Sequence, residues 1–184
     1  MSGRFFRRPR AALAGVALCG AATVAALAAT GGTADAATGG IAAGGGVTSG
    51  YFTFTAVSSG MNLDVEGAST APGGRVIQWP ADGGTNQNWG FTTHDYLKNQ
   101  NSGMCLTTDG VAGDQLYQKP CLKRLARYQT WYPTCLPEGC LLAGDNGLVV
   151  DVYQGSTAEG AHIDAWPLNP NGPQPNQLFV ANPA

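Results

Sequence analysis

Three short motifs of similar composition recur along this 184-residue chain, each at the end of a segment of forty-odd residues. They are Gln87-Asn88-Trp89, Gln129-Thr130-Trp131 and Gln177-Leu178-Phe179. The segments also begin alike, with a turn sequence followed by an apolar stretch, as in residues 59–63 and 102–106. A period of this length is typical of a repeat architecture. The sequence therefore predicts one supersecondary unit that is built three times.

Between these motifs, short β-branched or aromatic runs alternate with clusters of Gly, Asn, Asp and Pro, a pattern that predicts short strands joined by turns. No long stretch of residues 37–184 keeps a helical period, and residues 121–127 are the one candidate for a helical turn or two. A single repeat is too small to bury its own apolar face, so the three repeats must share one core. We expect an all-β fold, and the threefold repetition favours a β-trefoil with pseudo-threefold symmetry over a sandwich.

With its three closing motifs, the chain resembles the ricin-type β-trefoil lectins, which also occur as carbohydrate-binding modules and end each repeat with Gln-x-Trp. The resemblance covers residues 51–184, which we expect to form the lectin domain. It implies that Trp89, Trp131 and Phe179 pack in the core, with the glutamines bonded to loop backbone. It also implies binding of hexose- or pentose-containing glycans, with galactose or xylan as the suggested ligands.

The N-terminal residues have the pattern of a secretory signal peptide. Four arginines within residues 4–10 precede an uncharged run over residues 11–29, and Ala34-Asp35-Ala36 offers a small-x-small cleavage site. We expect residues 1–36 to be removed and residues 37–50 to form a flexible Gly-rich leader. A retained membrane anchor is the alternative, although the run is mostly Ala and Gly and only weakly apolar. The protein should therefore be secreted and extracellular, with no membrane contact after cleavage.

Cleavage would change both the net charge and the number of cysteines. Loss of the four arginines and Asp35 leaves six basic and eleven acidic side chains, a net charge of about −5, which is evidence against nucleic-acid binding. Loss of Cys19 leaves four cysteines, and an even number favours disulfides in an exported chain. The sequence has neither CxxC pairs nor clustered histidines, so we expect no metal site and no cofactor.

The remaining cysteines, Cys105, Cys121, Cys135 and Cys140, allow three pairings. The resemblance favours Cys105 with Cys121, because a cystine in this family commonly ties the first strand of a repeat to the strand that carries the aromatic residue. The other pair would then be Cys135 with Cys140, around a short loop in which Pro137 and Gly139 favour a tight turn.

Two tryptophans, Trp79 and Trp166, stand at a second repeat-related position, each before a proline. Upstream of each lies an aspartate between apolar residues, Asp64 or Asp151, and the period of two along a strand predicts that the aspartate faces outward. An Asn-Gln pair follows downstream. The complete set is Asp64, Trp79, Asn86 and Gln87 in the first repeat, and Asp151, Trp166, Asn176 and Gln177 in the third.

This set matches the sugar site of the family residue by residue, so the resemblance implies carbohydrate-binding sites in the first and third repeats. The chemistry suits a sugar: a carboxylate accepts hydrogen bonds from hydroxyls, an amide donates and accepts, and an indole covers the apolar face of a pyranose. Taken alone, each residue is more commonly a solvated aspartate or a tryptophan packed under a loop. Recurrence in two repeats favours the sugar site. The longer loop over residues 168–175, with three prolines, predicts a different aperture in the third repeat.

The second repeat departs from the set at each position, with Thr107, Lys119 and Tyr128 in place of Asp, Trp and Asn. We expect no sugar site there. This repeat holds four of the six basic residues that remain after cleavage, namely Lys119, Lys123, Arg124 and Arg127. Such a cluster would suit an acidic glycan or a partner surface, but an ordinary solvated loop is the more common meaning of a charge run.

These patterns favour a monomeric lectin whose partners are glycans or polysaccharide. An enzyme would need paired carboxylates across a cleft or an activated nucleophile. The sequence shows neither, and His94 and His162 lie in unrelated contexts. The alternative is a trefoil that binds protein, as an interaction module or a protease inhibitor. The basic second repeat is its best support, and the repeated Asp, Trp and Asn set is evidence against it.

Overall fold

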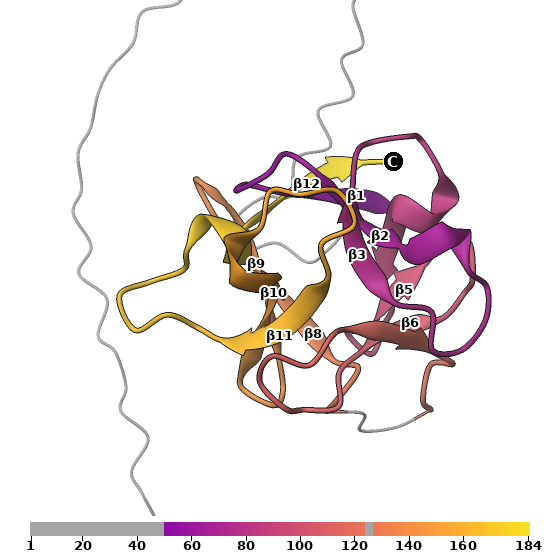
Figure 1. Cartoon of the computed structure of the whole chain (residues 1–184). Coiled ribbons are helices and arrows are strands. Elements are labelled where there is room, and N and C mark those ends of the chain that lie inside the picture. Colours follow the sequence, from indigo (N-terminus) through magenta and orange to yellow (C-terminus); the bar gives the residue numbers. More distant parts are fainter. Residues whose placement is uncertain (1–49, 124–126) are drawn as a thin grey trace, which may run out of the picture. The chain divides into compact units, whose positions relative to one another are not determined.

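The computed structural model describes residues 50–123 and 127–184, which form an all-β trefoil (Figure 1). The signal peptide and the Gly-rich leader fall outside the described residues. The helical turn predicted over residues 121–127 is not present at residues 121–123, and residues 124–126 also fall outside the described part.

Each repeat contributes four strands. The first repeat has β1 (Phe52–Ala56), β2 (Asn62–Val65), β3 (Val76–Trp79) and β4 (Asn88–Phe91). The second has β5 (Leu97–Asn99), β6 (Cys105–Thr107), β7 (Tyr117–Lys119) and β8 (Trp131–Leu136). The third has β9 (Gly139–Gly144), β10 (Leu148–Val152), β11 (Ile163–Pro167) and β12 (Phe179–Pro183). In the first and third repeats, one short 3₁₀ turn lies between the two hairpin strands and another precedes the last strand. They are η1 (Glu66–Ala68) and η2 (Thr85–Gln87) in the first repeat, and η3 (Tyr153–Gly155) and η4 (Pro175–Gln177) in the third.

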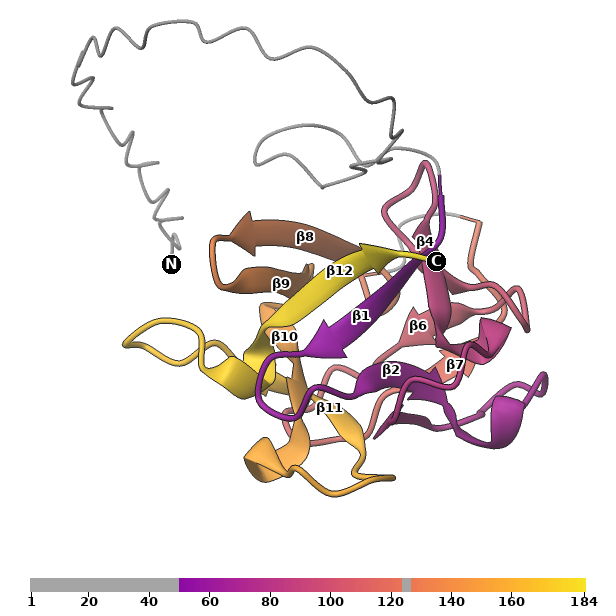
Figure 2. The ribbon, with the colours of Figure 1, turned by 90° about the horizontal axis from the view of Figure 1, so that it is seen from above.

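Six of these strands close into a barrel. Strand β1 pairs with β12 on one side and with β4 on the other, and Figure 2 shows β1 and β12 side by side. The ring continues from β4 to β5, and from β8 through β9 back to β12. Between β5 and β8 it closes through a bridge of Tyr96 with Thr130 and a 2.8 Å hydrogen bond from the Trp131 amide to the Asp95 carbonyl. Closure leaves few strand edges exposed.

The other six strands form three hairpins, β2 with β3, β6 with β7 and β10 with β11. Single backbone bridges join each hairpin region to both of the others: Arg75 to Tyr117, Ile77 to His162, and Gln115 to Asp164. Equivalent residues form all three bridges: Arg75, Gln115 and His162 occupy one position of the repeat, and Ile77, Tyr117 and Asp164 occupy the other. The pockets described below lie along these hairpins, so their walls combine residues from neighbouring repeats.

The aromatic residues of the closing motifs fill the shared core, which confirms the role that the resemblance implied. Trp89, Trp131 and Phe179 are fully buried. The indole Nε1 of Trp89 donates to the Leu63 carbonyl at 3.0 Å, and that of Trp131 donates to the Leu106 carbonyl at 3.0 Å. These bonds fasten the hairpins of the first two repeats to the core.

Both expected disulfides are present. Cys105 in β6 is bonded to Cys121, which follows β7, so this bond ties together the hairpin of the second repeat. Cys135 in β8 is bonded to Cys140 in β9, across the tight turn that joins the two strands.

Candidate functional site

Three of the four residues predicted for the first repeat, Asp64, Trp79 and Asn86, line one cavity of about 440 Å³. Asp64 lies on β2 and is only 3% exposed, so it belongs to the floor. Trp79 ends β3 and is 39% exposed, so its indole forms an open wall. Asn86 comes from η2. The cavity therefore combines a carboxylate, an amide and an aromatic face.

The fourth residue, Gln87, holds the floor in place instead of lining the cavity. Its Nε2 donates to Asp64 Oδ2 at 2.9 Å and to the Pro80 carbonyl at 2.9 Å, which ties the loop after β3 to the aspartate. Asn86 Nδ2 donates to the same oxygen at 2.8 Å. Among the described residues no donor bonds Asp64 Oδ1. That oxygen can therefore accept a hydrogen bond from a ligand in the cavity.

The neighbours of both aspartates, such as Leu63 and Val65, pack in the core, so the aspartates point away from it as expected, yet they are shielded from solvent. Asp64 and Asp151 are 3% and 4% exposed, because the turns η2 and η4 supply side chains that pack over them. Burial raises the pKa of both carboxyl groups, and the hydrogen bonds from Asn and Gln side chains oppose the rise. Both aspartates are thus held rigidly at the cavity floors.

The third repeat brings its predicted residues together in the same way. Asp151, Trp166 and Asn176 line a cavity of about 530 Å³, and Asn176 Nδ2 donates to Asp151 Oδ1 at 2.9 Å. Trp166 is 48% exposed. Gln177 donates to the Pro167 carbonyl at 3.1 Å and also bonds the Asp151 side chain, which repeats the role of Gln87.

The loop over residues 168–175 adds a further cavity of about 280 Å³, which Trp166 and Gln177 also line. Figure 1 shows this loop, between β11 and β12, extending away from the barrel. The third-repeat tryptophan therefore borders two cavities, one toward the second repeat and one toward its own loop. The longer loop thus changes the shape of the third-repeat site, as its sequence suggested.

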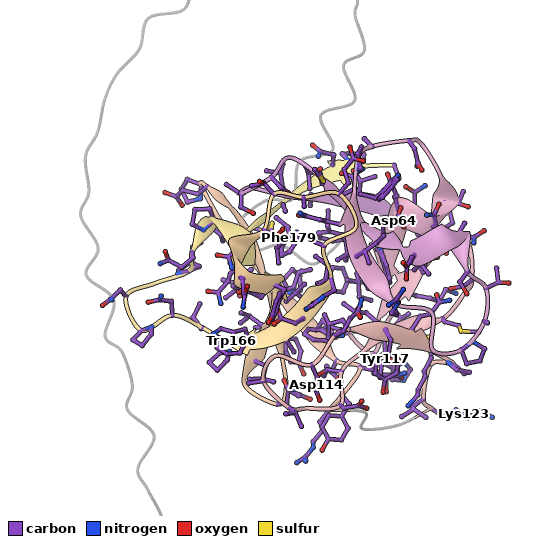
Figure 3. The ribbon with its side chains drawn as sticks, in the orientation of Figure 1. Asp64, Asp114, Tyr117, Lys123, Trp166 and Phe179 are labelled. Atoms are coloured by element: carbon purple, nitrogen blue, oxygen red, sulfur yellow. A yellow bond between two sulfur atoms is a disulfide. The ribbon has the colours of Figure 1, made fainter. Side chains whose placement is uncertain are left out.

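Each large cavity is completed by a neighbouring repeat. Gly160 of the third repeat lines the first-repeat cavity, and Gly113 and Asp114 of the second repeat line the third-repeat cavity. Gly113 has φ +89°, and a Cβ there would lie 3.2 Å from Trp166 Cζ3, so only glycine fits without a shift. Figure 3 shows Trp166 and Asp114 in the same region beside β11, with Asp64 elsewhere on the domain. Sequence reasoning missed these residues because it treated each repeat by itself.

Asp164 is a second carboxylate at the third-repeat site that the sequence analysis did not identify. It stands directly opposite Asp151 in the β10–β11 register, lines the same cavity and is 2% exposed. Burial and, after it, the charge of Asp151 raise its pKa to about 7. The apolar neighbours in Ile163-Asp164-Ala165 repeat the pattern around Asp64, and this signal could have revealed it.

In the second repeat Thr107 and Lys119 are hydrogen-bonded to residues outside the Thr107, Lys119 and Tyr128 set. Thr107 Oγ1 accepts a hydrogen bond from Gln129 at 2.9 Å. The Tyr117 hydroxyl donates to Asp109, and Lys119 Nζ donates to the same hydroxyl at 2.9 Å. Among the basic residues of this repeat, Arg124 falls outside the described part. The absence of a sugar site here stays a prediction.

The described ranges lack the features of a metal site and of a membrane-spanning helix. No group of three or more His, Cys, Asp or Glu side chains in residues 50–123 and 127–184 is arranged to hold a metal ion. Within the same ranges, no helix has the length and apolar character needed to cross a bilayer.

A threefold barrel with a carboxylate, an indole and an amide around each of two related cavities has the features of a carbohydrate-binding trefoil. The sequence model of the family described as "Ricin-type beta-trefoil lectin domain" matches residues 50–179. The chain therefore belongs to the ricin-type β-trefoil lectin family, whose members are carbohydrate-binding lectins.

Several solved structures are similar. The designed threefold-symmetric protein ThreeFoil is 29% identical with a TM-score of 0.65, over 73% of this chain and 99% of that one. The C-terminal half of the earthworm R-type lectin, in complex with GalNAc, is 23% identical with a TM-score of 0.62, over 73% and 99%. An exo-β-1,3-galactanase from Clostridium thermocellum is 24% identical with a TM-score of 0.65, over 73% of this chain but only 30% of the enzyme. The likeness to the last two shows the fold alone. Among curated proteins no sequence matches significantly.

Proposed function

We propose that this protein is a secreted, monomeric lectin that binds galactose- or xylose-containing glycans through its first and third repeats, without catalysis. The observation that carries this proposal is the recurrence of one arrangement, Asp, Trp and Asn around a cavity, at two related places. The signal-like N-terminus and the two disulfides support secretion.

The first-repeat cavity offers the contacts that a pyranose needs. Asp64 Oδ1 accepts hydrogen bonds from sugar hydroxyls, while Asn86 and Gln87 hold the opposite oxygen. The exposed indole of Trp79 covers the apolar C–H face of the ring. The third repeat supplies the same contacts from Asp151 and Trp166.

The choice of galactose or xylose rests on the family resemblance. The earthworm lectin with GalNAc and the galactanase are consistent with a galactose-type ligand. An acidic floor beneath an exposed indole is equally compatible with other neutral pyranoses, so the ligand must be identified by a broad survey of glycans.

The placement of the carboxylates favours binding over hydrolysis. Asp151 and Asp164 stand opposite each other on two strands of one hairpin, so both belong to the same floor. Hydrolysis of a glycosidic bond requires two carboxyl groups that flank the bond. A sugar above this floor would meet both groups from one side.

Each site should bind weakly, with a dissociation constant of about 1 mM, because open pockets leave much of the sugar in water. Two sites on one rigid domain can raise avidity for a polymer by about 10² to 10⁴. A polysaccharide or a multivalent glycan is therefore the expected ligand.

The test begins with a glycan array and continues with calorimetry on the preferred sugar. The unmodified protein should bind two monosaccharides. Asp64→Ala or Trp79→Ala should each reduce this number to one, because the loss of a hydrogen-bonding or stacking partner costs about 1–2 kcal/mol at an already weak site. The matched control is Lys119→Ala, at the position equivalent to Trp79, which should leave two sites.

Double substitution of Asp64 and Asp151 by Ala should abolish binding. Binding that survives the double substitution, or a stoichiometry of three, would contradict the assignment of the two sites. A protein that binds no glycan on the array would favour the protein-interaction alternative.

A further inference from the structure

The two large cavities differ in how their carboxylates are arranged. The third-repeat cavity is lined by Asp114, Asp151 and Asp164. The first-repeat cavity is also lined by three carboxylates, Asp64, Glu66 and Asp82, of which Glu66 is paired with Arg75 at 2.7 and 2.9 Å. The cross-strand partner of Asp64 is the apolar Ile77, whereas that of Asp151 is Asp164. Of these two cavities, the third-repeat one is therefore the one in which two carboxylates stand directly opposite each other on a hairpin.

Asp164 is also the residue of this cavity whose hydrogen bonding is incomplete. Its Oδ1 is buried and has no hydrogen-bond partner among the described residues. An unpaired buried carboxylate oxygen is costly, and a second carboxylate directly across the hairpin adds repulsion. A ligand that brings positive charge and several N–H donors would relieve both costs at once.

We propose that the third-repeat cavity selects a sugar that carries a free protonated amine, with Asp164 as the residue that determines this specificity. The inference rests on the proposed lectin function and deepens it for one of the two sites. An ammonium group has three donors and no acceptor, so it can bond Asp151 and Asp164 together while the pyranose covers Trp166. A neutral hydroxyl can bond only one of the carboxylates as a donor and leaves their repulsion in place.

The pH dependence of binding distinguishes the two kinds of ligand. Burial and the charge of Asp151 raise the pKa of Asp164 to about 7, so below that pH the empty cavity holds a proton. An ammonium must displace this proton. Affinity for an amino sugar should therefore rise as the pH rises from about 5 to about 7, whereas affinity for the neutral sugar should not.

Other groups face Asp164 and require a control. Asp151 faces it from β10, Asp114 from the second-repeat loop and Tyr153 from η3. His162 lies two residues before it on β11, with its ring 4.1 Å from that of Tyr153. A positive charge on His162 would also repel an ammonium. His162→Gln must therefore keep the pH dependence if Asp164 is its source.

The experiment uses calorimetry on the Trp79→Ala protein, in which the first-repeat site is disabled. The probes are galactosamine against galactose and glucosamine against glucose, at pH 7. The amino sugar of the preferred pair should bind about tenfold more tightly, the ratio that one charge-assisted hydrogen bond can carry. Asp164→Ile, which copies the first repeat, and Asp164→Asn, which keeps the shape of the side chain, should both reduce the preference to about twofold or less.

The reciprocal change provides a gain of function. In a Trp166→Ala protein, Ile77→Asp should confer the amino-sugar preference on the first-repeat cavity. Equal binding of the amino and neutral sugars by the third repeat, or a preference that survives both Asp164 substitutions, would overturn the inference and leave the proposed lectin function intact. Failure of the unmodified protein to bind any of the four sugars or any arrayed glycan would overturn both.

Discussion

Truncation of a buried and an exposed tryptophan should have opposite effects on stability and on binding. Trp131 is fully buried and its Nε1 donates to the Leu106 carbonyl at 3.0 Å, whereas Trp166 is 48% exposed. Trp131→Ala should cost about 3–5 kcal/mol for the lost packing and the cavity that remains. The buried Leu106 carbonyl loses its partner as well, at a cost of about 1–3 kcal/mol. The total is a large share of the 5–15 kcal/mol that stabilise a typical domain.

Thermal unfolding followed by circular dichroism measures this difference. For a domain of this size, 1 kcal/mol lowers Tm by roughly 4 °C, so Trp131→Ala should melt at least about 12 °C earlier or fail to fold. Trp166→Ala should melt within a few degrees of the unmodified protein, because its indole contributes little to the core, but should lose the third-repeat site. Equal shifts in Tm for the two variants would refute the separation of core and binding tryptophans.

Three further predictions concern the carboxylate pair, one disulfide and one glycine. The free energy of unfolding should fall as pH rises from about 4 to about 7. The reason is that Asp164 keeps its proton up to about pH 7 in the folded protein, whereas the unfolded chain releases this proton near pH 3.8. The loss of stability is on the order of 4 kcal/mol. Urea titrations at pH 5 and pH 8 should show the part of this loss that falls above pH 5, about 3 kcal/mol, and Asp164→Asn should remove most of it. Replacement of Cys105 and Cys121 by Ser should cost about 3 kcal/mol, because their bond closes a loop with a separation of 16 residues; an unchanged urea midpoint would contradict this. Gly113→Ala should weaken binding at the third repeat, since its Cβ would press on Trp166, and titration to an unchanged stoichiometry of two would contradict it.

The features that the sequence predicted are local or strictly repeated. The closing motifs revealed the threefold organisation because their aromatic position serves the core in each repeat, and Trp89 and Trp131 even make the same bond to the hairpin. The pairing of Cys135 with Cys140 was what the resemblance left for these cysteines, and the turn sequence between them fitted it. Patterns of this kind need no knowledge of how the repeats meet.

The burial of the aspartates was not predicted, because strand alternation describes only the two faces of one strand. Asp64 does face away from the core cluster, but Asn86 and Gln87, more than twenty residues later in the chain, bond over it. The same holds for Asp151 with Asn176. A distant turn can therefore bury a side chain on the outer face of a hairpin. The alternation of residues along the strand does not indicate where such a turn lies.

The contributions of Gly113 and Asp114 to the third-repeat cavity could not be predicted from the sequence for a different reason. Each hairpin contacts both of the others through single bridges, and those contacts bring a loop of one repeat against the tryptophan of the next. Symmetry alone would make the three cavities alike. The second repeat replaces the liganding set itself, and the residue across the hairpin from the first liganding position also differs among the repeats: it is Ile77, Tyr117 or Asp164.

That position distinguishes the first repeat from the third, which share the Asp, Trp and Asn set. Ile77 leaves Asp64 as the only floor carboxylate from its hairpin, Tyr117 bonds Asp109 and Lys119, and Asp164 places a second carboxylate beside Asp151. The backbone register is the same in all three cases, so the changes need no rearrangement of the fold. The hairpins thus share one backbone arrangement, and the residue at the cross-strand position gives the first-repeat and third-repeat cavities a different chemistry.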